Sequence, residues 1–546
     1  MPIVSLGDLG PVRCHRCKAY VCPFMEFFDG GRRFKCPFCR ANSDVPEAYF
    51  AHLDHTGRRV DITHRPELLF GSYELVAPKE YCKNSVFPKP PAFIFMIDVS
   101  YNAVRSGLVS LFCSNIKSLL SNLPKDYGME DSAIEVGFAT YDQSLHFYNL
   151  KSAVGQPQML IVGDVKDVFV PLVEGFFVKP REAEAAIDSL LQQIPAMFAE
   201  SRVTEIVLGP VIQAGADAFK AADRSGKLFI FHSSLPIMEA PGKLNNRDDR
   251  KLLGTDKEKQ LLLPSKDVAD FYDKETENCV SVGCCVDIFL FPNSYTDVAT
   301  IGRFCASTGG QVYKYGYFQA EKDGKRFIGD LGNDIARPIA FDAIMRVRTS
   351  TGIRPTGFYG NFYMSNTTDV EFGAVDCDKC VTIEVKHDDK LDENEGAFIQ
   401  AALLFTSVSG QRRLRIHNLA LGIAADLPTL YRYADLDALI NFLAKDCERM
   451  LLAKNGQEMR SHLISKTAQM LATYRSKCSQ PSSPGQLILP EAMKLLPLYA
   501  NCILKHDGIA GGQELNTDDK AWLMLSIPPL RVQDSVCFFY PRLLPA

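Results

Sequence analysis

The chain has 546 residues, a formal net charge of −5, 46% hydrophobic residues and 23% charged residues. A chain of this length is too long to fold around one hydrophobic core, so the sequence predicts about three to five domains. The net acidity argues against a protein whose whole surface binds nucleic acid. The 17 cysteines are scattered, with neighbours at Cys284 and Cys285, which favours a reducing compartment over a disulfide framework. We find no signal-peptide pattern and no apolar run of the roughly 18 residues that a membrane span needs, so we expect a cytosolic protein.

Residues 1–52 contain the strongest motif of the chain. Cys14 and Cys17 form one Cys-x-x-Cys pair, and Cys36 and Cys39 form a second pair after a gap of 18 residues. This spacing is typical of a zinc ribbon with four thiolate ligands. Four protein ligands leave no position for water or substrate, so we expect one structural Zn²⁺ and no metal catalysis. A module of this size has too small a core to stand alone, so its aromatic residues are expected to pack on a neighbouring domain.

The next two segments are predicted to be β-rich and then mixed. Residues 53–90 look extended, with a strand at 72–77, and are expected to add strands to a later β-sandwich. Residues 91–337 alternate between buried strands and amphipathic helices, which predicts a parallel, doubly wound sheet. The expected strands are 92–99, 134–140, 159–162, 228–231, 286–291 and 312–315. The expected helices are 107–123, 183–199, 211–222 and 294–308.

The remaining residues divide into a β-rich and a helical part. Short β-type segments separated by Gly, Asn and Asp predict a β-sandwich over 338–425, with strands at 343–348, 360–364, 381–385, 396–406 and 411–421. Apolar residues with a period of 3.6 predict a helical domain over 426–534, with helices at 430–452, 458–478, 487–506 and 517–525. Residues 535–546 open with an apolar run at 536–540, which predicts a strand that begins a further domain.

Three clusters of basic residues occur in this chain of net negative charge. They comprise Arg13, Arg16 and Lys18 beside the first cysteine pair, Arg346 and Arg348 two apart in a predicted strand, and Arg412, Arg413 and Arg415 in another. Residues two apart share one face of a strand. Solvated surface charge explains each cluster, and the alternative is recognition of acidic peptide side chains or anionic headgroups, to which Arg is well matched.

Three further motifs carry weaker chemical signals. Asp98, Ser100 and Asn102 follow the first buried strand of the predicted sheet, where a Mg²⁺ adhesion site would have the pattern Asp-x-Ser-x-Ser. Because Asn102 replaces the second Ser, the other interpretation is an Asp that caps the following helix. The pair Cys377-x-x-Cys380 lies in a β-rich context that favours incidental thiols over a redox or metal site. The sequon Asn366-Thr-Thr is expected to form a surface turn.

Catalytic motifs are absent from the sequence. We find no Gly-x-Ser-x-Gly elbow, P-loop, His-Glu-x-x-His or kinase motif set. Together with a zinc site that has no open position, this favours a binding scaffold over an enzyme.

The predicted order of zinc ribbon, von Willebrand A-like trunk, β-sandwich and helical domain resembles the cargo-adaptor subunits of the inner COPII coat. The resemblance is carried by the strings at 12–20, 91–102, 240–250, 346–352 and 411–419. The C/D-type paralogues are the most similar, and we expect the D type. That family has a long disordered N-terminal region and a C-terminal gelsolin-like domain. The resemblance therefore implies that the chain lacks the first and that 535–546 begin a truncated copy of the second.

The resemblance implies a non-enzymatic adaptor at endoplasmic reticulum exit sites and on the vesicle coat. Its expected partners are the GTPase-activating inner-coat subunit as heterodimer partner, the small coat GTPase, the outer-coat cage subunits, acidic membrane, and cytosolic sorting-signal peptides of cargo and SNAREs. Arg13 and Lys18 match family positions that contact acidic residues of these signals. Other paralogue types have Arg at the second position, and Lys makes a point contact instead of a planar fork. C/D types are also associated with Ile-x-Met signals, which need an apolar groove.

Two other functions share parts of this pattern. The GTPase-activating sister subunit has the same predicted architecture. A metal-dependent adhesion protein would use Asp98 and Ser100 to hold Mg²⁺.

Overall fold

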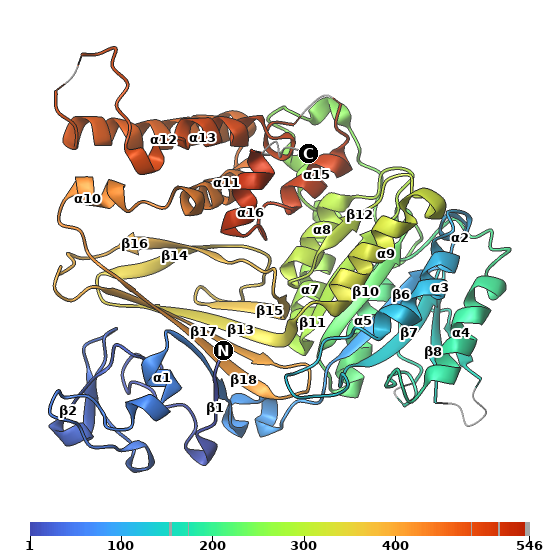
Figure 1. Cartoon of the computed structure of the whole chain (residues 1–546). Helices are drawn as coiled ribbons and strands as arrows, with labels where there is room; N and C mark the ends of the chain where they lie inside the picture. The colour runs from blue at the N-terminus through green and yellow to red at the C-terminus, as the bar shows by residue number, and fades with distance from the viewer. Residues whose placement is uncertain (152–155, 173, 482, 512–513, 541–546) are drawn as a thin grey trace.

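The computed structural model describes residues 1–151, 156–172, 174–481, 483–511 and 514–540, and shows four packed parts (Figure 1). A zinc ribbon near the N-terminus lies against one sheet of a β-sandwich, a helical domain covers the sandwich from the opposite side, and an α/β trunk packs beside both. Among the described helices, none is both long and apolar enough to span a bilayer.

The trunk is built on a seven-stranded sheet in the order β12-β11-β10-β6-β7-β8-β9. Its strands are β6 (Ala92–Asp98), β7 (Glu135–Tyr141), β8 (Leu145–Asn149), β9 (Gln158–Val162), β10 (Gly226–His232), β11 (Cys284–Leu290) and β12 (Val312–Lys314). Five strands are parallel, as expected, but β8 and β9 run antiparallel to their neighbours. The strand predicted at 159–162 is β9 and joins this sheet, but its parallel pairing was wrong. The prediction missed β8, which follows β7 after a tight turn and pairs antiparallel with both neighbours.

Helices cover both faces of the trunk sheet. One face packs on α3 (Leu108–Leu120), α4 (Glu184–Met197) and α9 (Ala320–Ala336), and the other on α5 (Gly209–Ala222), α7 (Lys266–Val282) and α8 (Val298–Ser307). Successive residues of β6 enter opposite cores, with Phe93 and Phe95 in one and Ile94 and Met96 in the other. This two-sided burial explains why the strand is apolar at nearly every position. The short helices α2 (Tyr101–Arg105) and α6 (Lys259–Leu262) complete the trunk.

The sandwich pairs a six-stranded sheet, β1-β5-β18-β17-β13-β15, with the two-stranded sheet β14-β16. The strands are β1 (Ile3–Val4), β5 (Ser72–Val76), β13 (Ile339–Thr349), β14 (Ile353–Tyr359), β15 (Asp369–Asp376), β16 (Thr382–His387), β17 (Ala397–Thr406) and β18 (Arg412–Leu421). The strand predicted at 360–364 was wrong. The chain turns at Gly360, whose φ is 149°, and only Tyr363 makes an isolated bridge, to Glu371.

The helical domain contains α10 (Leu427–Arg432), α11 (Leu436–Ala453), α12 (Gly456–Lys477), α13 (Leu496–Lys505), α14 (Asp507–Ala510), α15 (Thr517–Leu525) and α16 (Val532–Phe539). The strand predicted at 536–540 was wrong, because most of this run belongs to α16. Val536 and Phe539 are three residues apart and enter the same helical core, which is helical spacing and not strand alternation. Asp518 of α15 accepts hydrogen bonds from the backbone N–H groups of Thr296 and Val298, and so joins this domain to the trunk.

Candidate metal centre and the basic surface beside it

The two cysteine pairs form two nearly identical turns, which we call the first knuckle (residues 14–19) and the second knuckle (residues 36–41). In the first, the N–H of Cys14 donates to the carbonyl of Ala19 over 2.8 Å, and in the second, the N–H of Cys36 donates to Ala41 over 3.0 Å. The residue after each second cysteine has positive φ, 58° at Lys18 and 59° at Arg40. Each turn thereby directs both of its thiols inward and a basic residue outward.

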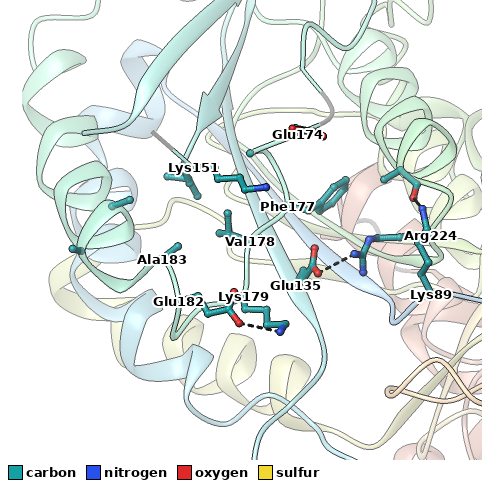
Figure 2. A pocket seen from close by; sticks show the side chains of 15 residues that line it. Lys89, Glu135, Lys151, Glu174, Phe177, Val178, Lys179, Glu182, Ala183 and Arg224 are labelled. Carbon is teal, nitrogen blue, oxygen red and sulfur yellow. Dashed lines mark hydrogen bonds and ion pairs between the residues drawn. The ribbon is translucent and has the colours of Figure 1, made fainter. Parts of the chain in front are cut away.

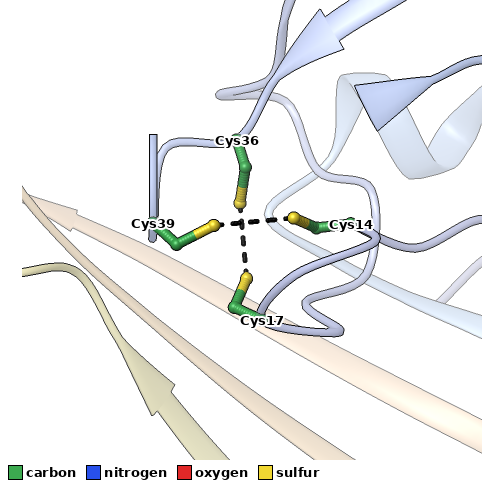
Figure 3. Close-up of side chains that lie close together, drawn as sticks. All are labelled: Cys14, Cys17, Cys36 and Cys39. Carbon is green, nitrogen blue, oxygen red and sulfur yellow. Dashed lines mark hydrogen bonds between the residues drawn. The ribbon is translucent and has the colours of Figure 1, made fainter. Parts of the chain in front are cut away.

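The four thiols converge on one point, as Figure 3 shows for Cys14, Cys17, Cys36 and Cys39. All four Sγ atoms lie within 4.8 Å of one another, and the pairs Cys14–Cys39 and Cys17–Cys36 are each 3.5 Å apart. A tetrahedral zinc with Zn–S bonds of about 2.3 Å requires sulfur–sulfur edges of about 3.8 Å. The donor set therefore fits a single tetrahedral zinc with no open ligand position.

The surroundings of the four thiols favour the charged form at Cys17, while burial raises the pKa of Cys39. Contact with Cys36 lowers the pKa of Cys17 to about 5, so one thiolate is present at neutral pH. The hydroxyl of Ser43 donates to Cys14 Sγ over 3.6 Å and lies 3.0 Å from His15 Nδ1. Such outer contacts orient the ligands of metal sites. Cys22 is different, because burial raises its pKa to about 12 and it lies outside the four-thiol group.

The ribbon is fixed to the large sheet of the sandwich. Gln400 of β17 is fully buried, accepts a hydrogen bond from the N–H of Tyr20 over 2.8 Å and donates to the Tyr20 carbonyl over 3.0 Å. Phe398, also on β17, packs on Phe24 and Phe38 at ring distances of 5.2 and 6.3 Å. Aromatic residues of the ribbon thus pack on a neighbouring domain, which supplies the core that the small module lacks.

Basic side chains gather around Tyr20 next to the first knuckle. Arg13 lies over the Tyr20 ring at 4.5 Å and donates from Nε to the Lys18 carbonyl over 2.9 Å. Arg348, from β13, lies 5.7 Å from the same ring and donates from Nε to the Cys17 carbonyl over 3.3 Å. Its Nη1 is buried without a partner, and burial lowers the pKa of this guanidinium. Lys18 is exposed beside them.

We call Arg13, Lys18 and Arg348 the basic triplet. Within the described residues, no acidic side chain makes an ion pair with any of them. The sequence placed Arg13 and Lys18 together because they flank one knuckle. Only the fold adds Arg348, which is over 300 residues away in the chain.

Three other predicted basic residues, Arg346, Arg412 and Arg413, are already paired within the protein. Arg346 forms a two-pronged ion pair with Asp369, with both contacts 2.5 Å long. Arg412 is only 4% exposed, and its Nη1 donates to the Asp342 carbonyl over 2.7 Å and lies 3.2 Å from the Asp342 carboxylate. The expectation that Arg412 contacts an external anion is therefore not met. Arg413 lies 3.3 Å from Asp126 and 3.6 Å from Glu74.

Asp98 lies at the end of β6, where a Mg²⁺ site was considered. Its carboxylate is fully buried and accepts hydrogen bonds from the N–H groups of Ser100 and Ser233 and from the Ser233 hydroxyl. Burial raises the pKa of Asp98. Both carboxylate oxygens are thus engaged within the protein, and Asp98 connects the end of β6 to the residue that follows β10. It does not cap the helix by a direct bond to α2, which was the other interpretation.

One further motif and one cleft lie away from the metal centre. The Asn366 side chain accepts hydrogen bonds from the N–H groups of Thr368 and Asp369, which confirms a surface turn. A cleft of about 670 Å³ opens in the trunk beside β7 (Figure 2). Four of its charged residues form ion pairs, Arg224 with Glu135 and Lys179 with Glu182, each at 2.9 Å.

Comparison with known proteins now identifies the family. Models described as Sec23/Sec24 zinc finger, trunk domain, beta-sandwich domain and helical domain match residues 11–49, 88–335, 340–424 and 435–537. Human Sec24C is 58% identical over 100% of this chain and 49% of its own length, and human Sec24D is 55% identical over 100% and 52%. The chain belongs to the Sec24 family. A crystal structure of the human COPII-coat protein Sec24c superposes with a TM-score of 0.95, at 57% identity over 99% of this chain and 71% of that one.

These findings confirm the predicted C/D type and fold class, and the choice of the D type stays a prediction. The match of the zinc-finger model across all four cysteines assigns one structural zinc to this chain. The chain spans about half the length of the curated relatives it matches.

Proposed function

We propose that this chain is a cargo adaptor of the COPII coat that binds acidic sorting signals on cytosolic tails of cargo and SNAREs. The observation that carries the proposal is the basic triplet, which makes no ion pair with the described acidic residues. Arg13 and Arg348 are held by hydrogen bonds to carbonyls of the first knuckle, and Lys18 is exposed on the same knuckle. Unpaired cations in a fixed arrangement are matched to carboxylates of a ligand. The names of the relatives, transport proteins of the Sec24 class, support the same function.

The second knuckle supports this proposal from within the same molecule. Arg40 occupies there the position that Lys18 has in the first knuckle, and it forms an ion pair with Glu395 of the sandwich. A basic residue at this point of a zinc knuckle is therefore placed to hold a carboxylate. In the first knuckle, we propose that the carboxylate comes from a peptide.

The remaining partners follow from family membership. We propose that the chain pairs through its trunk with the GTPase-activating inner-coat subunit and is recruited by the small coat GTPase. It would then contact outer-coat cage subunits and acidic membrane on the cytosolic face of endoplasmic reticulum exit sites. The adaptor itself is proposed to be non-enzymatic. The alternative function, GTPase activation by this chain, finds no support in relatives named Sec24.

Single signals are expected to bind weakly. A short tail peptide covers little surface, so we expect a Kd of about 10–100 μM. Assembly of many adaptors on one membrane raises the effective concentration of signals and supplies avidity without new contacts. Weak single-site binding therefore suits a coat that must also release its cargo.

Fluorescence anisotropy with two labelled peptides tests the proposal. One peptide carries acidic residues and the other replaces each Glu by Gln, so that length and apolar content are matched. We expect the acidic peptide to bind more tightly and to lose this advantage in high salt. Equal affinities would contradict the proposed recognition. A GTP-hydrolysis assay with the coat GTPase tests the alternative, since stimulation by this chain alone would favour it.

A further inference from the structure

The loop between β15 and β16 places a cysteine against a buried lysine. Lys445 of α11 is 1% exposed, and its Nζ lies 3.6 Å from Cys380 Sγ and 3.0 Å from the Thr382 hydroxyl. Cys380 as a residue is half-buried, whereas the lysine beside it is buried. The contact lies where the sandwich meets the helical domain, next to a 2.7 Å hydrogen bond from Thr382 to Asn441.

The buried ammonium of Lys445 is not neutralised by an acid. No carboxylate of the described residues pairs with Lys445, and the next residue, Asp446, is engaged by Arg449, His462 and Lys466. Burial lowers the pKa of Lys445, and Cys380 is the one group that opposes this effect. A buried charge without a partner is unfavourable, so a negative charge on Cys380 stabilises the lysine as much as the lysine stabilises the thiolate.

We propose that Cys380 is a nucleophilic thiolate, held by Lys445, that is oxidised by hydrogen peroxide to a sulfenic acid. The thiolate sulfur attacks one peroxide oxygen, the S–O bond forms and the O–O bond breaks. Two electrons pass from sulfur to the peroxide, and the Lys445 ammonium gives its proton to the departing hydroxide. The products are a Cys380 sulfenic acid, neutral Lys445 and one water. This site is separate from the zinc and from the basic triplet.

Cys377 on the same loop is a natural control. It is more exposed than Cys380, yet burial of its thiol and the neighbouring carboxylates of Asp378 and Asp376 raise its pKa. If exposure controls reactivity, Cys377 should react first. If the charge of the neighbouring side chains controls it, Cys380 should react first. The two explanations give opposite orders of reactivity for thiols three residues apart.

Site-resolved mass spectrometry of the full, zinc-loaded chain distinguishes them. The protein is treated with hydrogen peroxide in the presence of dimedone, which traps sulfenic acids, and is digested with trypsin. Cleavage after Lys379 separates the two cysteines into different peptides. We expect dimedone on Cys380 before Cys377. Iodoacetamide alkylation at pH 7 is expected to show the same order, since it also requires thiolate.

The variant Lys445→Met tests the role of the lysine. We expect it to slow alkylation of Cys380 by about tenfold, the effect of one pKa unit, and to leave Cys377 unchanged. An unchanged Cys380 rate in a folded variant would overturn the proposal. If the variant does not fold, the relative reaction rates of the two thiols in the parent chain test the proposal. Faster reaction of Cys377 than of Cys380 contradicts it.

Discussion

The two knuckles of the ribbon share a backbone and differ in their surroundings. Each places a basic residue at positive φ, Lys18 in the first knuckle and Arg40 in the second. Arg40 is paired with Glu395, whereas Lys18 lies beside Arg13 and Arg348 without an acidic partner among the described residues. The same backbone hydrogen bonds and φ values give both turns one shape, and the neighbouring side chains decide which turn has a cation free to bind a ligand.

Removal of zinc is expected to have the largest effect, because it abolishes both turns at once. The ribbon has little core of its own, and structural zinc sites contribute about 10 kcal/mol or more to folding. We expect a chelated sample to lose all affinity for acidic peptides and to regain it when zinc returns, while the trunk keeps its thermal transition. Metal content, calorimetry and peptide anisotropy measure this. Peptide binding that survives the loss of zinc would show that the basic triplet does not depend on the metal.

Arg412 and Arg348 should respond in opposite ways to substitution by Met. Arg412→Met leaves Asp342 with Lys83 as its ion-pair partner and removes the buried hydrogen bond to the Asp342 carbonyl. We therefore expect a loss of about 2 kcal/mol in stability and no change in peptide affinity. Arg348→Met removes a half-buried charge whose Nη1 has no partner, so stability should hold or rise while peptide affinity falls. Denaturant unfolding and anisotropy on both variants give the comparison. If both variants lose stability and keep their peptide affinity, Arg348 has a structural role and does not bind the peptide.

Charge reversal at the two equivalent positions sharpens the contrast between the knuckles. Lys18→Glu should weaken acidic-peptide binding by about tenfold or more, because it places like charges together. Its melting temperature should not change, since Lys18 is exposed and unpaired. Arg40→Glu should do the reverse, with a loss of up to about 1 kcal/mol in stability from the broken surface pair and unchanged affinity. Weakened binding in Arg40→Glu would mean that the second knuckle also contacts the peptide.

The smallest expected effect is that of Mg²⁺ on binding. Ser100 and Ser233 already donate to the Asp98 carboxylate, so added Mg²⁺ should leave peptide affinity unchanged at constant ionic strength. Anisotropy with Mg²⁺ against a matched sodium salt tests this. A specific gain in affinity would restore the adhesion-site interpretation.

The sequence predicted the parts of the fold that depend on neighbouring residues in the chain. Cysteine spacing fixes the metal site, because each knuckle is one turn. The strand at 92–99 was predictable because burial on both faces leaves a continuous apolar run. The apolar run at 536–540 was wrongly predicted as a strand, because a short apolar segment does not distinguish a strand from a buried helix. Helices α7 and α9 were not predicted, because many of their residues are charged and only one stripe is buried.

The site was only partly predictable because it crosses distant segments. Arg13 and Lys18 lie near each other by sequence, and the string containing Arg346 and Arg348 drew attention to β13. Nothing local distinguishes Arg348, which reaches the knuckle, from Arg346, which pairs with Asp369. The burial of Arg412 depends in the same way on a strand pairing between β5 and β18 that joins residues over 300 positions apart.

A double-mutant cycle between Lys18 and one peptide carboxylate tests the central claim most directly. Affinities are measured for the parent and for Lys18→Met, each with the acidic peptide and with its Glu→Gln counterpart. If the ammonium contacts that carboxylate, the two changes should not add, and the coupling energy should reach about 1 kcal/mol. Full additivity for every acidic position of the peptide would show that the first knuckle does not bind the signal.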